Sequence, residues 1–222
     1  MRFAYENDRA GTPIPRRIRL IDRAARLVHT CSIMNTSNHT ARYDQNATLP
    51  AVELPAGGMN WLRPLFQQGI RVRIPSGISA SDLLVDVFGV DPEYVRKRIT
   101  TVFLDGSVVD SMDTAWLHEG SCLALSAAMP GLVGATMRKG GYYAAMRGAI
   151  TLDAGQEGVT NATGQMVEVV VKLFNLLIDE IGPAILAHGI AMAPGDAADL
   201  FGEQSCGVSV GSPDIWLRVL AR

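Results

Sequence analysis

Alternating apolar and polar positions first become regular just after Gly69. Residues 70–74 alternate isoleucine or valine with arginine, which predicts a strand with one buried face. A helix is expected to begin at Ser79, because Ser79 and Asp82 have the spacing of a capping box and the next apolar residues share one helical face. Gly89 supplies the residue that ends this helix.

The residues after Gly89 predict three more strands. Residues 99–104 are β-branched and aromatic, and Asp105-Gly106 is a strong signal for a two-residue hairpin turn that returns through residues 107–109. Another strand is expected over residues 121–125. The predicted order of elements is therefore strand, helix, strand, strand, strand.

The C-terminal third predicts a second small α/β unit. Residues 167–171 read as a strand, residues 173–181 carry an apolar stripe at helical spacing, and Pro183 is expected to start a second helix that Gly189 ends. Two segments also echo each other, because residues 64–70 loosely resemble residues 183–190. The number of residues between matching positions differs by one in the two segments, which favours coincidence over duplication.

The residues of the middle third resemble a known fold. The runs 101–109, 117–121 and 122–128 resemble the β-grasp, or ubiquitin-like, superfold, and most closely the small sulfur carriers of molybdopterin and thiamine synthesis. The resemblance covers about residues 69–131. It implies a hairpin, an acidic-Gly turn, a last strand of alternating apolar residues and a tail of small residues. Two features depart from it: residues 61–63 are only a weak candidate for the first strand, and the chain continues well past the last strand.

These patterns predict an α+β protein in three parts. Residues 1–58 form a basic arm and linker, residues 59–141 a β-grasp-like domain, and residues 142–222 a small α/β C-terminal unit. An amphipathic helix with a cationic face is expected in the arm. A solvated helix or an unfolded extension is favoured there over an arm for nucleic acid or anionic lipid.

Charge is distributed unevenly along the 222 residues, of which 48% are hydrophobic. Eight arginines against three acidic residues give residues 1–42 a charge of +5, which leaves −7 for the rest of a chain of net charge −2. The net charge of the whole chain therefore gives no reason to expect nucleic acid or a membrane surface as a partner. The most apolar stretch, residues 167–194, is interrupted by charges and by a Gly-Pro pair, so no membrane span is expected.

The chemistry-bearing residues match no catalytic or metal-binding pattern. Cys31, Cys122 and Cys206 are too few and too far apart for a disulfide framework, a zinc ribbon or a ferredoxin cluster, and they favour a reducing cytoplasm. Residues 207–211 match the G-x-S-x-G nucleophile motif, but no histidine comes after them, since His188 is the last one. No catalytic residue, metal or cofactor is predicted.

The stretch 129–141 is the most unusual in the chain. A glycine loop that turns and packs closely is the favoured interpretation, and a precursor junction cleaved after Gly141 is the alternative, since ubiquitin-like proteins end in a basic residue and Gly-Gly. In either case the stretch is the candidate partner-binding site. Its candidate residues are Met129, Pro130, Gly131, Gly134, Arg138, Lys139, Gly140 and Gly141.

Three functions remain open. The leading hypothesis is a cytoplasmic, non-enzymatic β-grasp interaction or adaptor protein, whose sheet and 127–141 tail contact a larger protein. The first alternative is a sulfur-carrier-like or ubiquitin-like precursor processed after Gly141. The second is a self-assembling structural subunit that buries its Gly/Ala-rich segments against other copies of the chain.

Overall fold

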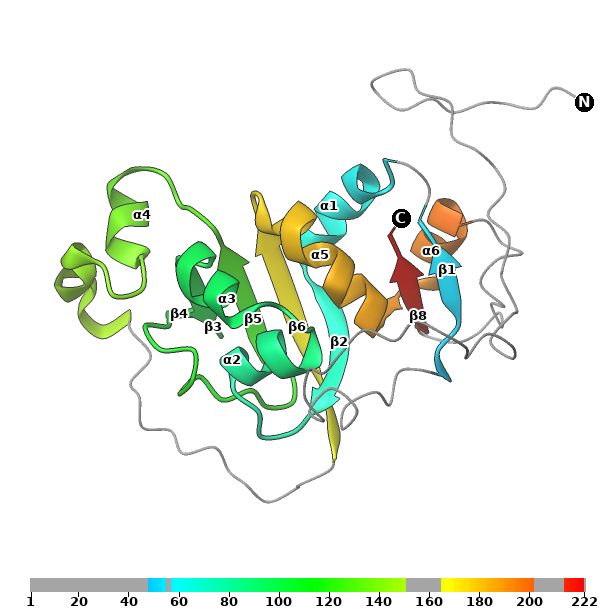
Figure 1. Ribbon diagram of the computed structural model, residues 1–222, viewed down its shortest axis with the longest axis horizontal. Coiled ribbons are helices and arrows are strands. Elements are labelled where there is room, and N and C mark those ends of the chain that lie inside the picture. The colour runs from blue at the N-terminus through cyan, green and yellow to red at the C-terminus, as the bar shows by residue number, and fades with distance from the viewer. Residues whose placement is uncertain (1–47, 55–56, 151–164, 202–213, 222) are drawn as a thin grey trace, which may run out of the picture.

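The computed structural model of the chain describes residues 48–54, 57–150, 165–201 and 214–221 (Figure 1). Within these residues eight strands form one mixed sheet, in the order β1-β8-β7-β2-β6-β5-β3-β4. The strands are β1 (Ala51–Glu53), β2 (Ile70–Pro75), β3 (Thr101–Leu104), β4 (Ser107–Val108), β5 (Cys122–Ser126), β6 (Met166–Phe174), β7 (Ile190–Met192) and β8 (Ile215–Leu220). The helices are α1 (Met59–Gln68), α2 (Ala80–Asp82), the π-helical turn η3 (Leu83–Val87), α3 (Pro92–Arg98), α4 (Gly131–Met137), the 3₁₀ helix η4 (Tyr142–Ile150), α5 (Leu177–His188) and α6 (Pro194–Phe201). The chain therefore has the predicted α+β class.

The long strand β6 lies at the centre of the sheet. It pairs antiparallel with β2, with Val72 opposite Val169, and parallel with β5, with Leu123 opposite Val171. Alternate residues of β6 are buried against the helices, which confirms the predicted alternation. The domain boundary after residue 141 stays a prediction, but the sheet crosses it, because β6 lies between two strands of the middle third.

One face of the sheet carries the apolar core. Helices α1, α3 and α5 and the turn η3 all contribute buried side chains to it, among them Phe66, Leu84 and Ile185. The other face carries half-buried residues such as Arg71 and Arg73 of β2. In the described part of the chain, no helix has the length and apolar character that crossing a membrane requires.

The local signals in the middle third are confirmed. Ser79 and Asp82 form the capping box, since the Ser79 hydroxyl accepts from the Asp82 amide at 3.1 Å and the Asp82 carboxylate accepts from the Ser79 amide at 3.2 Å. The hairpin turns at Asp105 and Gly106, which have φ values of 51° and 84°. The Asp105 carboxylate also accepts from the Cys122 amide at 2.6 Å, which ties the turn to β5.

Two sequence expectations are wrong, and the weak candidate for a first strand is not a strand. Residues 61–63 are helical rather than a first strand, because Leu62 and Phe66 repeat at helical spacing and both are buried in α1. Pro183 lies inside the single helix α5, whose buried face runs past it to Ile185. Residues 51–53, expected as linker, form strand β1 parallel to β8. The basic segment 1–42 and the motif at 207–211 lie outside the described residues.

The echo between the two halves has a structural counterpart. Helices α1 and α5 each carry an internal proline and each end at a glycine, Gly69 and Gly189, with φ values of 114° and 123°. A strand begins directly after each glycine, and these strands, β2 and β7, pair antiparallel with Arg71 opposite Ala191. A side chain at position 69 would also be crowded, since its Cβ would lie 2.5 Å from Val170 Cγ1 and would force that side chain to move.

Candidate partner-binding site

The stretch singled out by the sequence forms a compact extension beyond β5, at the end of the molecule that α4 occupies in Figure 1. Helix α4, a turn at residues 138–141 and η4 succeed one another there, and we call residues 129–147 the α4–η4 segment. The Lys139 amide donates to the Thr100 carbonyl at 2.9 Å, which anchors the turn beside β3. The segment is therefore attached to the body through the backbone at its turn.

Close packing explains the glycine at position 134. A Cβ there would lie 1.8 Å from the carbonyl oxygen of Met129, so no side chain fits without moving the backbone. Gly134 is buried, whereas Gly140 is exposed and donates its amide to the Asp110 carboxylate at 2.9 Å. Because helix α4 occupies residues 131–137, the stretch is not a single glycine loop. The close packing at Gly134 and the positive φ of 59° at Gly140 agree with the part of that interpretation that concerns packing and turning.

A buried arginine holds the segment together. The side chain of Arg147 is 0% exposed and makes two hydrogen bonds of 2.9 Å to the two carboxylate oxygens of Asp110. It also donates to the carbonyls of Thr136 at 2.6 Å and Arg138 at 2.8 Å. Arg147 thus joins α4, the turn, η4 and the loop after β4. The sequence contains no spacing that would have identified it.

Asp110 is the acceptor at the centre of this arrangement. Burial acts to raise its pKa, but the hydrogen bonds from Arg147 and from the Gly140 amide together act more strongly, so the pKa of Asp110 lies below its ordinary value. The carboxylate is therefore ionised at neutral pH, and both of its oxygens accept hydrogen bonds from the segment.

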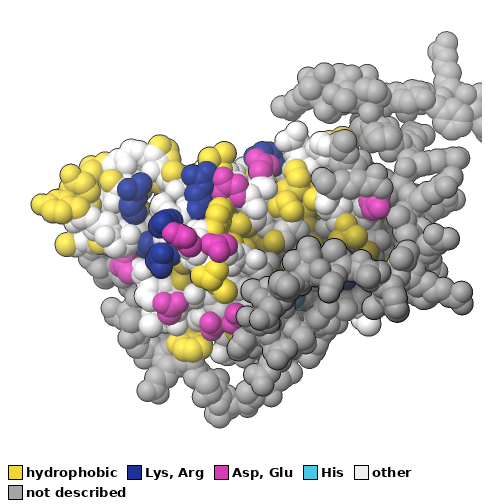
Figure 2. All heavy atoms as spheres, in the orientation of Figure 1, with side chains coloured by type: hydrophobic (Ala, Val, Ile, Leu, Met, Phe, Trp, Pro, Cys, Tyr) yellow, Lys and Arg dark blue, Asp and Glu magenta, His cyan; other side chains and the backbone are white. Residues whose placement is uncertain are grey.

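The outer side of the segment is apolar and exposed. Six of the ten exposed large apolar side chains among the described residues belong to it, and the exposed fraction reaches 70% for Leu132, 71% for Met146 and 92% for Tyr142. We call these side chains the α4–η4 surface: Met129, Leu132, Val133, Tyr142, Tyr143 and Met146. Figure 2 shows apolar side chains gathered at this end of the molecule.

The predicted site residues lie close together along the chain, and five of the eight are exposed: Met129, Pro130, Gly131, Arg138 and Gly140. Lys139 is half-buried, and Gly134 is buried. Their role in partner binding stays a prediction. Sequence reasoning missed the more exposed residues of α4 and η4, although the adjacent tyrosines at 142 and 143 were a visible signal.

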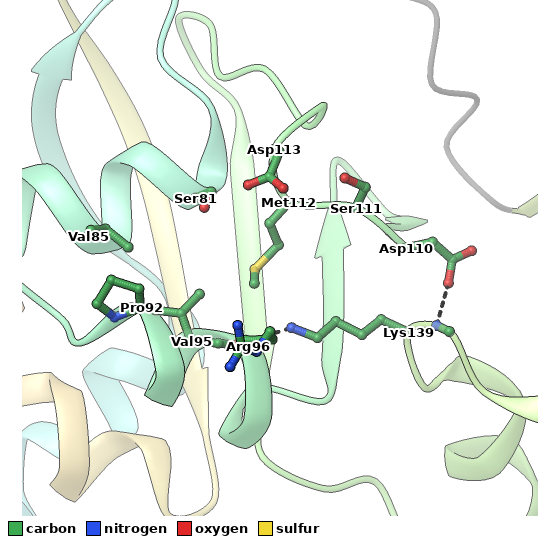
Figure 3. A pocket seen from close by; sticks show the side chains of 11 residues that line it. Ser81, Val85, Pro92, Val95, Arg96, Asp110, Ser111, Met112, Asp113 and Lys139 are labelled. Carbon is green, nitrogen blue, oxygen red and sulfur yellow. Dashed lines mark hydrogen bonds between the residues drawn. The ribbon is translucent and has the colours of Figure 1, made fainter.

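A cavity of about 380 Å³ lies beside the turn (Figure 3). Helix α3, the turn η3, residues 110–113 and Lys139 line it. The Lys139 side chain reaches across from the turn, and its Nζ donates to the Val95 carbonyl of α3 at 3.1 Å. The cavity is therefore separate from the exposed α4–η4 surface, although the same turn borders both.

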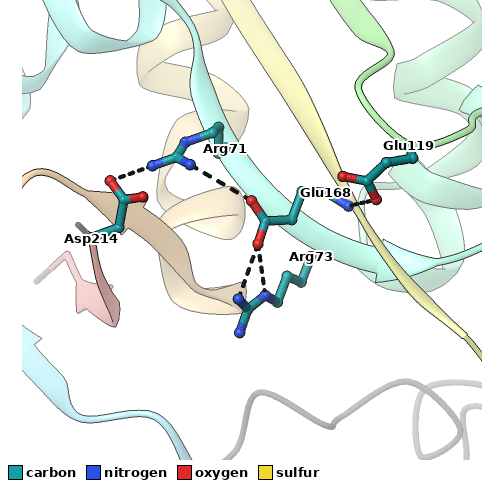
Figure 4. Close-up of polar contacts among 5 residues, drawn as sticks. All are labelled: Arg71, Arg73, Glu119, Glu168 and Asp214. Atoms are coloured by element: carbon teal, nitrogen blue, oxygen red, sulfur yellow. Dashed lines mark hydrogen bonds and ion pairs between the residues drawn. The ribbon is translucent and has the colours of Figure 1, made fainter. Parts of the chain in front are cut away.

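The opposite face of the sheet carries a paired charge network (Figure 4). Glu168 of β6 contacts Arg73 at 3.0 Å and Arg71 at 3.6 Å, and Arg71 also pairs with Asp214. The Arg73 guanidinium stacks 4.0 Å from the ring centroid of Trp216. The charges of the two arginines and the two carboxylates neutralise each other here. This face therefore leaves a partner fewer unpaired groups to bind than the α4–η4 segment does.

One serine contacts both a histidine and an aspartate, but its surroundings do not suit a nucleophile. The Ser121 hydroxyl lies 3.1 Å from His118 Nδ1 and 3.3 Å from the Asp105 carboxylate. Ser121 is 1% exposed, and its oxygen also accepts from the His118 amide at 3.2 Å. These contacts close the turn before β5 onto the hairpin. Across the described ranges, no three His, Cys, Asp or Glu side chains are grouped as metal ligands would be.

No family model, curated protein or solved structure matches the chain. The resemblance to the β-grasp superfold and to the sulfur carriers therefore stays a prediction. A function for this protein has to be inferred from its own residues and contacts.

Proposed function

We propose that the chain is a non-enzymatic interaction protein of β-grasp type that binds a larger protein through the α4–η4 surface. The observation that carries this proposal is the concentration of exposed apolar side chains on one short segment. An exposed apolar patch of this kind is costly in water and is typical of a binding surface. Cytoplasmic localisation is part of the proposal.

The composition and rigidity of the surface support this role. Tyrosine, methionine and arginine are enriched at protein interfaces, and here Tyr142 and Met146 belong to the same short segment as an exposed Arg138. Arg147 holds the two helices together before any partner arrives. A preformed surface loses less conformational entropy on binding, which favours affinity.

The order of the elements supports the β-grasp part of the proposal. After β2 come α2 with η3, the short helix α3, the β3–β4 hairpin and β5, which apart from α3 is the order that the resemblance implies. No strand immediately precedes β2, because α1 does. We take β6, which pairs with β2 and β5 and comes later in the chain, as the substitute for the missing first strand.

The contacts around Gly141 favour an intact chain over a processed precursor. The Gly141 carbonyl accepts from the Ala144 amide at 2.9 Å, and η4 then carries Arg147 to Asp110. Cleavage after Gly141 would separate Arg147 from the peptide bonds it supports at residues 136 and 138. The carriers that the resemblance names end in a free tail, which this segment does not provide.

A capture experiment with a matched control tests the proposal. The double variant Leu132→Ser/Met146→Ser removes two exposed side chains of the surface, whereas Leu176→Ser removes a side chain that is 54% exposed at the start of helix α5. Tagged wild type and both variants are used to capture proteins from the native host, and binding of each purified candidate is then measured by calorimetry. We expect affinity for the true partner to fall by roughly tenfold or more in the double variant, as loss of two central apolar contacts implies.

The outcomes separate the hypotheses. Equal binding by the double variant and the Leu176→Ser control would contradict the proposed surface. Concentration-dependent dimerisation of the wild type in light scattering, lost only in the double variant, would instead support a self-assembling subunit. Thermal unfolding of both variants serves as a control, since substitutions at exposed positions change stability by only about 0.5 kcal/mol.

A further inference from the structure

The cavity beside the turn has both an apolar wall and charged groups. Val85, Pro92 and Met112 contribute apolar atoms, while Arg96 and Lys139 bring the two cations that line it (Figure 3). Its volume of about 380 Å³ lies within the usual range for small-molecule sites, which is roughly 300–1,000 Å³. The cavity can therefore hold a small organic molecule.

The amine of Lys139 is held in place without an ion pair. Its Nζ donates to the Val95 carbonyl, and no carboxylate of the described residues lies within 4.0 Å of it. Asp110, which also lines the cavity, is already bound by Arg147 and by the Gly140 amide. A half-buried lysine without a carboxylate partner is less stable in its charged form than a solvated lysine.

Arg96 lies on the same cavity and is not committed elsewhere. It is exposed on α3, and it makes no hydrogen bond or ion pair with any residue that the structure describes. A guanidinium with free donors is well suited to bind a phosphate or a carboxylate. The cavity thus places an anion-binding group and an amine around one apolar wall.

We propose that this cavity binds a small aldehyde or ketone that carries a phosphate or carboxylate group, with Lys139 forming an imine to the carbonyl carbon and Arg96 holding the anionic group. This inference goes beyond the proposed interaction function and does not depend on it. Lysine forms such adducts where its amine is partly desolvated.

The chemistry of the step balances without an oxidant or a reductant. The neutral Nζ attacks the carbonyl carbon and forms a C–N bond, and one proton moves from nitrogen to oxygen to give a carbinolamine. The hydroxyl takes up a second proton and leaves as water as the nitrogen lone pair forms the C=N bond, and the resulting iminium then loses its remaining N–H proton to water. The reaction is amine plus carbonyl to imine plus water.

Burial and one nearby carboxylate set the protonation of the Lys139 amine. Burial lowers the pKa of Lys139, and the carboxylate of Asp113 acts in the opposite direction but more weakly. Arg96, on the facing helix, has the same sign as a lysine ammonium, and Asp110 is neutralised by Arg147. The neutral amine is therefore more abundant at neutral pH than for a solvated lysine.

The small number of lysines makes a direct test possible. The chain has only three, Lys97, Lys139 and Lys172, and Lys97 is a matched control because it is 68% exposed and pairs with Glu93 on the surface of α3. The full chain is mixed with pyridoxal 5′-phosphate at neutral pH. Sodium borohydride then delivers hydride to the imine carbon and traps each adduct as a secondary amine. Peptide mass spectrometry measures the rate of labelling at each lysine.

We expect Lys139 to be labelled several-fold faster than Lys97 and Lys172, and the difference to widen as the pH is lowered from 9 to 7. Lys139→Arg should abolish the fast phase, and Lys97→Arg should leave it unchanged. Equal rates at the three lysines of the wild type would overturn the proposal, whatever the stability of the variants.

The anion-binding half is tested by changing the probe. Arg96→Gln should slow labelling by pyridoxal 5′-phosphate but not by pyridoxal, which lacks the phosphate, and inorganic phosphate should compete only with the first. Glyoxylate is an aldehyde that carries a carboxylate instead of a phosphate. The factor by which Arg96→Gln slows labelling by glyoxylate, compared with the factor for pyridoxal 5′-phosphate, distinguishes the two anion classes. Labelling of Lys139 that ignores both Arg96 and added phosphate would overturn the assignment of Arg96.

Discussion

The body of the molecule and the α4–η4 segment use similar side chains in opposite ways. In the body, Phe66, Val169 and Ile185 are fully buried between helices and sheet. In the segment, Leu132 and Met146 face solvent, and the fully buried side chain is that of an arginine, Arg147. One region is held by a shared apolar core and the other by directed hydrogen bonds, four of which come from Arg147.

This difference predicts how each region fails. Apolar burial is non-directional and spread over many residues, so loss of one core side chain weakens the whole body cooperatively. Hydrogen bonds concentrated in one guanidinium support only the groups that they reach, so their loss should open the segment alone. Substitutions in the body should therefore cause global unfolding, and substitutions in the segment local opening.

The largest effect is expected from a cavity in the body. Phe66→Ala removes a fully buried ring that packs against Gly182 of α5, and we expect the free energy of unfolding to fall by about 3–5 kcal/mol. Denaturant unfolding followed by circular dichroism measures this loss. Trp61→Ala, which removes a 37% exposed ring from the same helix, is the matched control and should cost far less. Similar losses in both variants would show that α1 does not carry the core as described.

A smaller and local effect is expected from Arg147→Met. The methionine leaves Asp110 without its guanidinium and the carbonyls of Thr136 and Arg138 without a donor, at a cost of about 1–3 kcal/mol. Hydrogen exchange should show faster exchange for amides of residues 131–147, while amides of β6 keep their protection. In Arg147→Lys, exchange of these amides should be faster than in the wild type and slower than in Arg147→Met, because an ammonium cannot make all four contacts. Equal loss of protection in β6 would contradict a local role.

The parts of the fold that depend on neighbouring residues could be predicted from the sequence. The alternation in β2 and β6, the Ser79–Asp82 capping box and the Asp105-Gly106 turn are all decided within a few residues. The insertion of β6 between β2 and β5 could not be predicted, because strand pairing joins residues that are far apart in the chain. Helix α1 could not be predicted because Pro64 interrupts its helical pattern. In the structure, α1 packs on the sheet with this proline inside the helix.

The candidate site was only half predictable for a related reason. The pair Leu132-Val133 and the pair Leu83-Leu84 are similar in sequence, yet Leu132 is 70% exposed and Leu83 is fully buried. Which apolar pair faces solvent is decided by what packs against it, not by its own pattern. The glycines of 131–141 are visibly unusual in the sequence, whereas Arg147 acquires its importance only from partners brought together by folding.

The smallest effect is expected from acid, and it concerns Asp110. Because its pKa in the folded chain lies below the ordinary value of 3.8, ionised Asp110 stabilises the segment at all pH values above 3.8, and this contribution is lost as the pH falls below 3.8 through the folded pKa. Its side chain is 40% exposed, so water replaces part of what is lost and the change should be smaller than that caused by Arg147→Met.

Hydrogen-exchange protection of the Gly140 amide, corrected for the intrinsic effect of pH, measures this contribution, because that amide donates to Asp110. In the wild type, protection should fall as the pH is lowered below about 3.8, while β6 amides remain protected. In Asp110→Asn, which cannot ionise, protection should already be low at neutral pH and should change little with pH. If the variant keeps the same acid dependence as the wild type, another titrating group controls the opening of the segment. The Asp110–Arg147 contact would then not be what holds the segment, and the contrast with the apolar body would not stand.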